Sequence, residues 1–88
     1  MRLVIKVPWV EYERGWGQRP DGYSLHLNVS DAHNFINEYW AKQPPREGGM
    51  APDEYSAPEH TSAWDIVEVT DETYEKVSLS KNGIREYK

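Results

Sequence analysis

Alternating apolar and polar residues predict two β-strands in the first third of the chain. In residues 2–7 three apolar side chains alternate with Arg2 and Lys6, and Val4 is the exception. Pro8 cannot donate a backbone hydrogen bond, so we expect the strand to end near it. Residues 23–29 alternate more strictly, with one apolar face and one polar face. For residues 9–14 the pattern leaves a short helical turn and an extended arm as equal alternatives.

A tight turn is expected directly before the second of these strands. Pro20, Asp21 and Gly22 follow the residue order of a β-turn. Proline presets φ at the second turn position, and glycine adopts a positive φ without steric cost. We therefore expect the chain to reverse here and enter strand 23–29.

An amphipathic helix is predicted over residues 31–42. Its apolar side chains recur at helical spacing and form one broad stripe. Ser30 is the expected N-cap, because a serine hydroxyl can accept a hydrogen bond from an early helical N–H. Two consecutive prolines, Pro44 and Pro45, end the helix.

The last third of the chain repeats the order of strand and helix. Residues 63–70 have the composition of a strand, and a second helix begins at a cap formed by Thr70 or by the aspartate that follows it. Asn82 and Gly83 suit the left-handed backbone that follows many helices. Residues 84–87 form either a short last strand or a docked tail.

This order of elements predicts a small α+β fold. We expect one domain over residues 1–88, with a three- to four-stranded sheet and two helices packed on one face, in the order β-β-α-β-α with a short final β as an option. Residues 43–62 hold four prolines and two glycines without periodicity, and we expect a long surface loop there. Loops of this length are often functional.

Negative charge is concentrated in the second half of the chain. The net charge is −5, and the 29 residues from 47 to 75 contain nine acids and no Lys or Arg. A stretch of one sign repels polyanions and attracts basic surfaces. We therefore expect no direct nucleic-acid binding through this region and favour a protein partner with a basic surface.

No recognisable signature of catalysis or metal binding occurs in the sequence. The chain has no cysteine, no phosphate-cradling glycine loop and no nucleophile elbow. His26, His33 and His60 lack the spacing of a metal clamp and are expected to be surface histidines. We therefore expect no enzyme, cofactor or metal. Since no apolar run is long enough for a signal peptide or a membrane span, we expect a soluble, cytoplasmic protein without membrane contact.

The segment before the second strand could hold a ligand. Its candidate residues, with the histidine of that strand, are Arg14, Trp16, Arg19, Tyr23 and His26. Arginines beside aromatic rings suit interaction hot spots and the stacking of a nucleotide. A nucleotide or small-metabolite pocket is therefore one hypothesis. The structural alternative is a hairpin whose aromatic rings lie in the core and whose arginines pair with nearby acids.

A second candidate surface is acidic. Tyr55 lies between prolines in a segment rich in carboxylates, an arrangement that suits a basic groove on a partner. The expected partner-binding residues are Asp53, Glu54, Tyr55, Glu59, Asp71 and Glu72. The two candidate segments share a short similarity in sequence, because residues 20–24 (PDGYS) resemble residues 52–56 (PDEYS).

Residues 13–26 (ERGWGQRPDGYSLH), together with 52–58 (PDEYSAP) and 81–87 (KNGIREY), resemble small uncharacterised accessory proteins encoded by bacteriophages and prophages. Such proteins have no established activity, so no functional residue is carried over. The resemblance implies a context: small phage accessory proteins often inhibit a host enzyme or defence complex, as anti-CRISPR proteins do, and several are acidic and compete for nucleic-acid-binding surfaces.

We therefore expect a phage-type inhibitor or adaptor that binds a host protein with a basic surface, in the bacterial cytoplasm. The nucleotide or metabolite domain is the alternative. A structural component that forms a homodimer through exposed aromatic side chains is the third.

Overall fold

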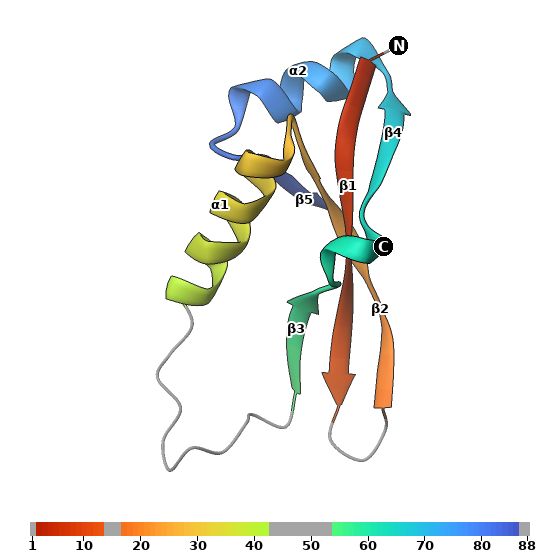
Figure 1. The fold of residues 1–88 in the computed structure, drawn as a ribbon, viewed down its shortest axis with the longest axis vertical. Coiled ribbons are helices and arrows are strands. Elements are labelled where there is room, and N and C mark those ends of the chain that lie inside the picture. Colours follow the sequence, from red (N-terminus) through yellow and green to blue (C-terminus); the bar gives the residue numbers. More distant parts are fainter. Residues whose placement is uncertain (1, 14–16, 43–53, 87–88) are drawn as a thin grey trace.

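The computed structural model describes residues 2–13, 17–42 and 54–86, which form a five-stranded sheet with two helices (Figure 1). The strands are β1 (Arg2–Glu13), β2 (Gly17–His26), β3 (Glu54–Pro58), β4 (Asp65–Val69) and β5 (Ile84–Glu86), and the helices are α1 (Val29–Ala41) and α2 (Asp71–Leu79). All four strand pairs described are antiparallel. The α+β class is confirmed, with more strands than the three or four expected.

Strand β1 is the centre of the sheet and has two neighbours in succession along one side. β2 pairs with it along the other side, while β4 pairs with residues 2–6 and β3 with residues 9–13. Figure 1 shows β1 as the long central arrow, with β4 beside its first half and β3 beside its second half. The extended alternative for residues 9–13 is therefore correct, and the helical turn is wrong.

Pro8 lies where β1 changes neighbours, and it does not end the strand as expected. Its carbonyl oxygen accepts a hydrogen bond from the backbone N–H of Glu59 (2.9 Å), on the side of β3 and β4. A strand residue directs its N–H and C=O toward the same neighbour, so the N–H that proline lacks would have pointed away from β2. The proline therefore removes no hydrogen bond from the β1–β2 ladder.

The Pro-Asp-Gly segment forms a bulge within β2 rather than a turn before it. One residue lies between Pro8 and Val10 of β1, whereas two lie between their partners on β2. Asp21 and Gly22 therefore oppose a single residue, and Gly22 has a φ of 77°. A glycine with positive φ is typical of one class of β-bulge. The expected turn is wrong, although Gly22 has the positive φ that such a turn requires.

The two helices cover opposite faces of the sheet. The register of β1 with its neighbours is continuous between Val4 and Val7, so these two side chains point to opposite faces. Val4 belongs to a core cluster with Val77 of α2, and Val7 to a second cluster with Ala32 of α1. The expectation that both helices share one face is therefore wrong.

Both helices begin at a side-chain cap. Asn28 caps α1, because its Oδ1 accepts the backbone N–H of Asp31 (2.8 Å), so Ser30, the expected cap, lies in the first turn. Of the two expected caps of α2, Thr70 is the correct one, and its Oγ1 accepts the N–H of Thr73 (3.1 Å).

Asn82 and Gly83 have the left-handed backbone expected, with φ of 63° and 123°. They lie beyond the end of α2, whose C-cap is Ser80, and lead into β5. The alternative of a short last strand is thus correct.

The expected long loop at residues 43–62 contains a strand. β3 pairs with β1, and a 3-10 turn, Thr61–Ala63, follows it. The backbone carbonyl of Ser56 accepts a hydrogen bond from the Tyr39 hydroxyl of α1 (2.7 Å), which ties β3 to the helix. The loop prediction is wrong for residues 54–58, and residues 43–53 lie outside the described residues.

Candidate functional site

Strand β4 lies at an edge of the sheet and carries exposed acidic and apolar side chains. Within the ranges that the structure describes, its one partner strand is β1. Ile66 is 69 % exposed, and its neighbours Asp65 and Glu68 are exposed too. Asp71 and Glu72 continue the exposed acidic surface into the first turn of α2. We call these five residues the acidic edge.

An exposed apolar side chain of β1 adjoins the acidic edge. Leu3 is 59 % exposed and pairs in register with Glu68, while Ile5 pairs with Ile66. Leu3 and Ile66 therefore lie diagonally on the sheet face that α1 covers farther along β1. Apolar side chains left open beside an edge strand are typical of surfaces that bind another chain.

An ion pair with Arg2 neutralises little of the negative charge of the acidic edge. Arg2 approaches Asp71, with 3.8 Å between Nε and Oδ1, but the two side chains are 62 % and 81 % exposed. Ion pairs this exposed contribute about 0–1 kcal/mol and are screened by salt. The pair therefore does little to block a basic partner.

The acids predicted to bind a partner divide into three groups. Asp71 and Glu72 belong to the acidic edge. Glu59 follows β3 and is partly buried. Asp53 lies outside the described residues, and Glu54 and Tyr55 are described as backbone of β3 alone. Sequence reasoning did not include Asp65, Ile66 and Glu68 among the binding residues, although two charged positions in a short predicted strand are a signal of an edge.

The three described residues of the proposed ligand set are not brought together in one pocket. Arg19 is exposed on β2 and pairs with Glu11, with 3.2 Å between Nε and Oε2. The ring of Tyr23 lies on the α2 face of the sheet beneath Lys6, whose Nζ is 4.7 Å from the ring centroid. His26 faces α1 on the other side. Two further members of the set, Arg14 and Trp16, lie outside the described residues.

A buried polar network lies beneath α1. Ser24 and His26 are fully buried. His26 Nδ1 lies 2.6 Å from the carbonyl oxygen of Asn82, which can only accept, so Nδ1 carries the proton. His26 Nε2 then accepts the hydroxyl proton of Ser24 (2.7 Å), and Ser24 Oγ accepts the indole N–H of Trp9 (2.8 Å). Every polar group of the network is satisfied.

This network is structural. A serine hydroxyl hydrogen-bonded to a histidine resembles the nucleophile and base of a hydrolase, but neither Ser24 nor His26 is exposed to a substrate. Burial lowers the pKa of His26 and favours the neutral ring. Gly83 closes over it so tightly that a Cβ there would overlap His26 Nδ1. The expectation of a surface histidine is wrong for His26, because α1 covers the polar face of β2.

Arg85 of β5 joins three strands. Its Nη2 contacts Asp21 Oδ2 of β2 (2.8 Å) and donates to Ser56 Oγ of β3 (2.6 Å). Its guanidinium lies 3.9 Å from the ring centroid of Trp9, and the Ser56 hydroxyl also donates to Asp21. Asp21 and Ser56 belong to the two similar sequence segments, 20–24 and 52–56. Both contact Arg85, a residue that sequence analysis did not single out.

Searches of the described residues and of known proteins add no further site. No group of three or more His, Cys, Asp or Glu side chains in the described ranges could hold a metal ion. No helix in that part of the chain is long and apolar enough to cross a membrane. No family model, curated protein or solved structure matches the chain.

Proposed function

We propose that the protein binds a partner protein through the acidic edge and that the contacting part of the partner is an extended segment with basic side chains. The observation that carries the proposal is the exposed Ile66 on edge strand β4, placed between Asp65 and Glu68. A strand at an edge offers backbone groups with which an extended segment can pair, and flanking side chains select its sequence.

Charge and apolar surface have separate parts in this binding. Ile66 and Leu3 offer apolar area that a partner can cover, which supplies affinity. The carboxylates supply complementarity to Lys and Arg, which speeds encounter and excludes acidic partners. Because the carboxylates are exposed, added salt should weaken their share strongly.

A second copy of the chain fits this edge poorly. Two β4 strands paired antiparallel about Val67 would place Ile66 opposite Glu68 and bring two acidic edges together. Each Glu68 would then lie diagonally across from the other Glu68 on one face of the paired strands, and the two negatively charged surfaces would repel each other. We expect a monomer by light scattering at high concentration, and a dimer that forms at low salt would contradict the charge argument.

The resemblance to phage accessory proteins favours a host protein as the partner. An extended basic segment that normally contacts nucleic acid has the charge that the acidic edge requires. Under this proposal the protein inhibits or modulates its partner by binding that segment.

A peptide titration tests the proposal directly. The probe is an extended peptide of alternating Lys and Val, with a Glu and Val peptide as its charge-reversed counterpart. We expect the Lys peptide to shift backbone amide resonances of residues 65–69 and its affinity to fall steeply between about 50 mM and about 500 mM salt. The Glu peptide should not bind.

Matched charge reversals locate the surface. Asp65→Lys combined with Glu68→Lys should abolish binding of the Lys peptide. Glu86→Lys is the control, because Glu86 is an exposed acid on β5, at the opposite edge of the sheet. Equal affinity in the double variant, or resonance shifts on β5 in place of β4, would contradict the assignment. The same variants then serve as controls in affinity capture from a bacterial lysate.

A further inference from the structure

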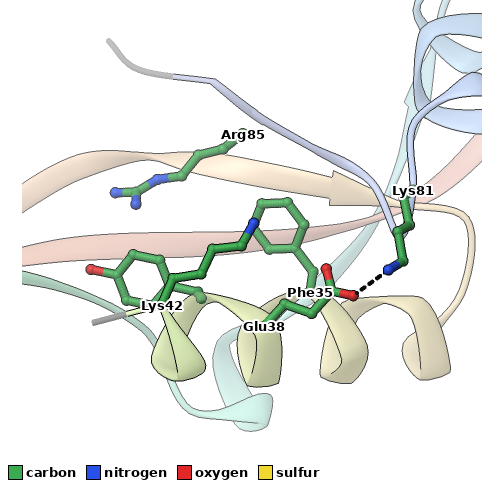
Figure 2. Close-up of a pocket in the computed structure, with 6 residues that line it drawn as sticks. Phe35, Glu38, Lys42, Lys81 and Arg85 are labelled. Atoms are coloured by element: carbon green, nitrogen blue, oxygen red, sulfur yellow. Dashed lines mark ion pairs between the residues drawn. The ribbon is translucent and has the colours of Figure 1, made fainter. Parts of the chain in front are cut away.

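A cavity of about 390 Å³ opens between α1 and the chain that runs from α2 into β5. Its lining residues are Phe35, Glu38, Tyr39, Lys42, Lys81 and Arg85. Figure 2 shows α1 as one wall, carrying Phe35, Glu38 and Lys42, and the chain bearing Lys81 and Arg85 as the opposite wall. The cavity thus combines cationic side chains with aromatic rings from segments distant in the sequence.

Positive charge converges on this cavity in a chain whose net charge is negative. The structure describes seven basic side chains, Arg2, Lys6, Arg19, Lys42, Lys76, Lys81 and Arg85. Three of the seven line the cavity, against one carboxylate. A hollow in which positive side chains outnumber negative ones has a positive potential that attracts a small anion.

The cations differ in how firmly they are held. Arg85, on the wall opposite α1, forms an ion pair with Asp21. Lys81 Nζ contacts Glu38 Oε1 at 2.9 Å, and its side chain is 81 % exposed. This hydrogen bond from Lys81 lowers the pKa of Glu38, which keeps the carboxylate charged. Glu38 is therefore a built-in competitor for any anion that approaches Lys81.

The aromatic rings are held in place by packing. Phe35 contacts Trp9 edge to face, with ring centroids 6.3 Å apart. Tyr39 also packs edge to face on Trp9 and donates its hydroxyl to the carbonyl of Ser56. Both rings are partly exposed and line the cavity. Fixed rings of this kind offer a surface on which a planar ligand can stack.

We propose that this cavity binds a small phosphate ester carrying an aromatic ring, of the kind represented by a nucleoside monophosphate. Lys42 and Lys81 hold the phosphate as point charges, and Phe35 and Tyr39 contact the ring. The cavity volume falls within the roughly 300–1,000 Å³ of known small-molecule sites. This site is independent of the acidic edge, since β5 and β4 lie at opposite edges of the sheet.

Three probes separate the two parts of the proposed ligand. We titrate the whole chain with AMP, adenosine and inorganic phosphate and follow the resonances of Phe35 and Lys81. AMP should bind more tightly than either fragment, because it engages the rings and the lysines together. Equal affinity for phosphate and AMP would overturn the role of the rings, and equal affinity for adenosine and AMP would overturn the role of the lysines. No binding of any probe would overturn the proposal.

Single substitutions test the lysines and the competing carboxylate. Lys42→Gln and Lys81→Gln should each weaken AMP binding about tenfold, as expected for one charge-assisted hydrogen bond. Lys76→Gln is the matched control, because Lys76 is an exposed lysine outside the cavity. Glu38→Gln should strengthen AMP binding several-fold, since it releases Lys81 for the phosphate.

The direction of the Glu38→Gln effect is decisive. Weaker AMP binding in Glu38→Gln, or an equal loss in Lys76→Gln and Lys81→Gln, would overturn the site and indicate nonspecific attraction. Circular dichroism of each variant confirms the fold, which these exposed substitutions should leave intact.

Discussion

At the residue scale, the proton of His26 is placed by its neighbours. The Asn82 carbonyl holds the proton on Nδ1, and the Ser24 hydroxyl occupies Nε2. Adding a second proton would place a charge in a buried site and turn Nε2 from an acceptor into a donor. The folded protein therefore resists protonation of this ring.

This resistance predicts a pH dependence of stability. An unfolded histidine has a pKa near 6.5, and folding lowers the pKa of His26. Below about pH 6.5 the unfolded chain binds a proton that the folded chain does not, so the free energy of unfolding falls as pH falls, by at most about 1.4 kcal/mol per pH unit. Above that pH this contribution to the slope vanishes. Urea unfolding at a series of pH values measures it.

Two histidine variants separate this effect from other titrations. In His26→Gln, the free energy of unfolding should no longer fall with pH between about pH 6.5 and the lowered pKa that His26 has in the folded protein. His60→Gln is the control, because His60 is exposed, and it should keep the slope. Identical slopes in the two variants would show that another group is responsible.

The burial of His26 was beyond the reach of the sequence. The alternation of residues 23–29 predicted a strand, which the structure has as far as His26, and it placed this histidine on the polar face. Burial of that face depends on where α1 packs, and β2 carries no local signal of it. Ser24 and His26 satisfy one another, which allows two polar residues to lie in a core.

At the element scale, the start of α1 shows what a cap contributes. Asn28→Ala removes the acceptor of the Asp31 N–H and should destabilise the protein by about 1 kcal/mol. Ser30→Ala changes an exposed residue inside the first turn and should stay within about 0.5 kcal/mol. Thermal or urea unfolding of both variants makes the comparison, and a larger loss for Ser30→Ala would place the cap where the sequence alone predicted it.

The elements that sequence analysis found have strong local signals, and those it missed lack them. Both helices and the core of β4 follow from periodicity and capping residues. β3 has five residues and ends in a proline, which is too little pattern to distinguish it from a loop. At the bulge in β2, Gly22 satisfies the local rule for a turn, and pairing with β1 decides the outcome.

At the scale of the whole molecule, Arg85 links parts of the chain that are far apart in sequence. Its side chain is mostly buried, and it bridges Asp21 and Ser56 beside Trp9. Removing one partner of a buried ion pair leaves the other charge without compensation. The sequence gives no local sign of this role.

Arg85→Met should therefore destabilise the fold by about 3 kcal/mol, the low end of the range for removing one partner of a buried ion pair, because Asp21 is 24 % exposed. The amide hydrogens of β3 should also exchange faster, because Ser56 loses its donor. Arg19→Met is the control, since Arg19 is exposed and pairs with Glu11, and its loss should cost less than about 1 kcal/mol. Equal effects of the two substitutions would contradict the linking role of Arg85.

The two candidate sites were predictable to different degrees. The sequence predicted the acidic stretch and, within the acidic edge, the two residues Asp71 and Glu72. It did not predict that β4 lies at an edge of the sheet. The cavity between α1 and β5 requires Lys42 and Lys81 to converge, which depends on tertiary packing alone. The sequence can thus indicate which charges are abundant, while the fold decides where they meet.

The changeover of neighbours at Pro8 bears on the order in which the chain folds. β1 and β2 are joined by a short connection and can pair early, as a hairpin does, within microseconds. The other side of β1 must wait for residues 54–69, so half of the central ladder forms by closing long loops. During synthesis β1 therefore leaves the ribosome long before β4. Until β3 and β4 follow, the backbone groups along one side of β1 can pair with a non-native strand.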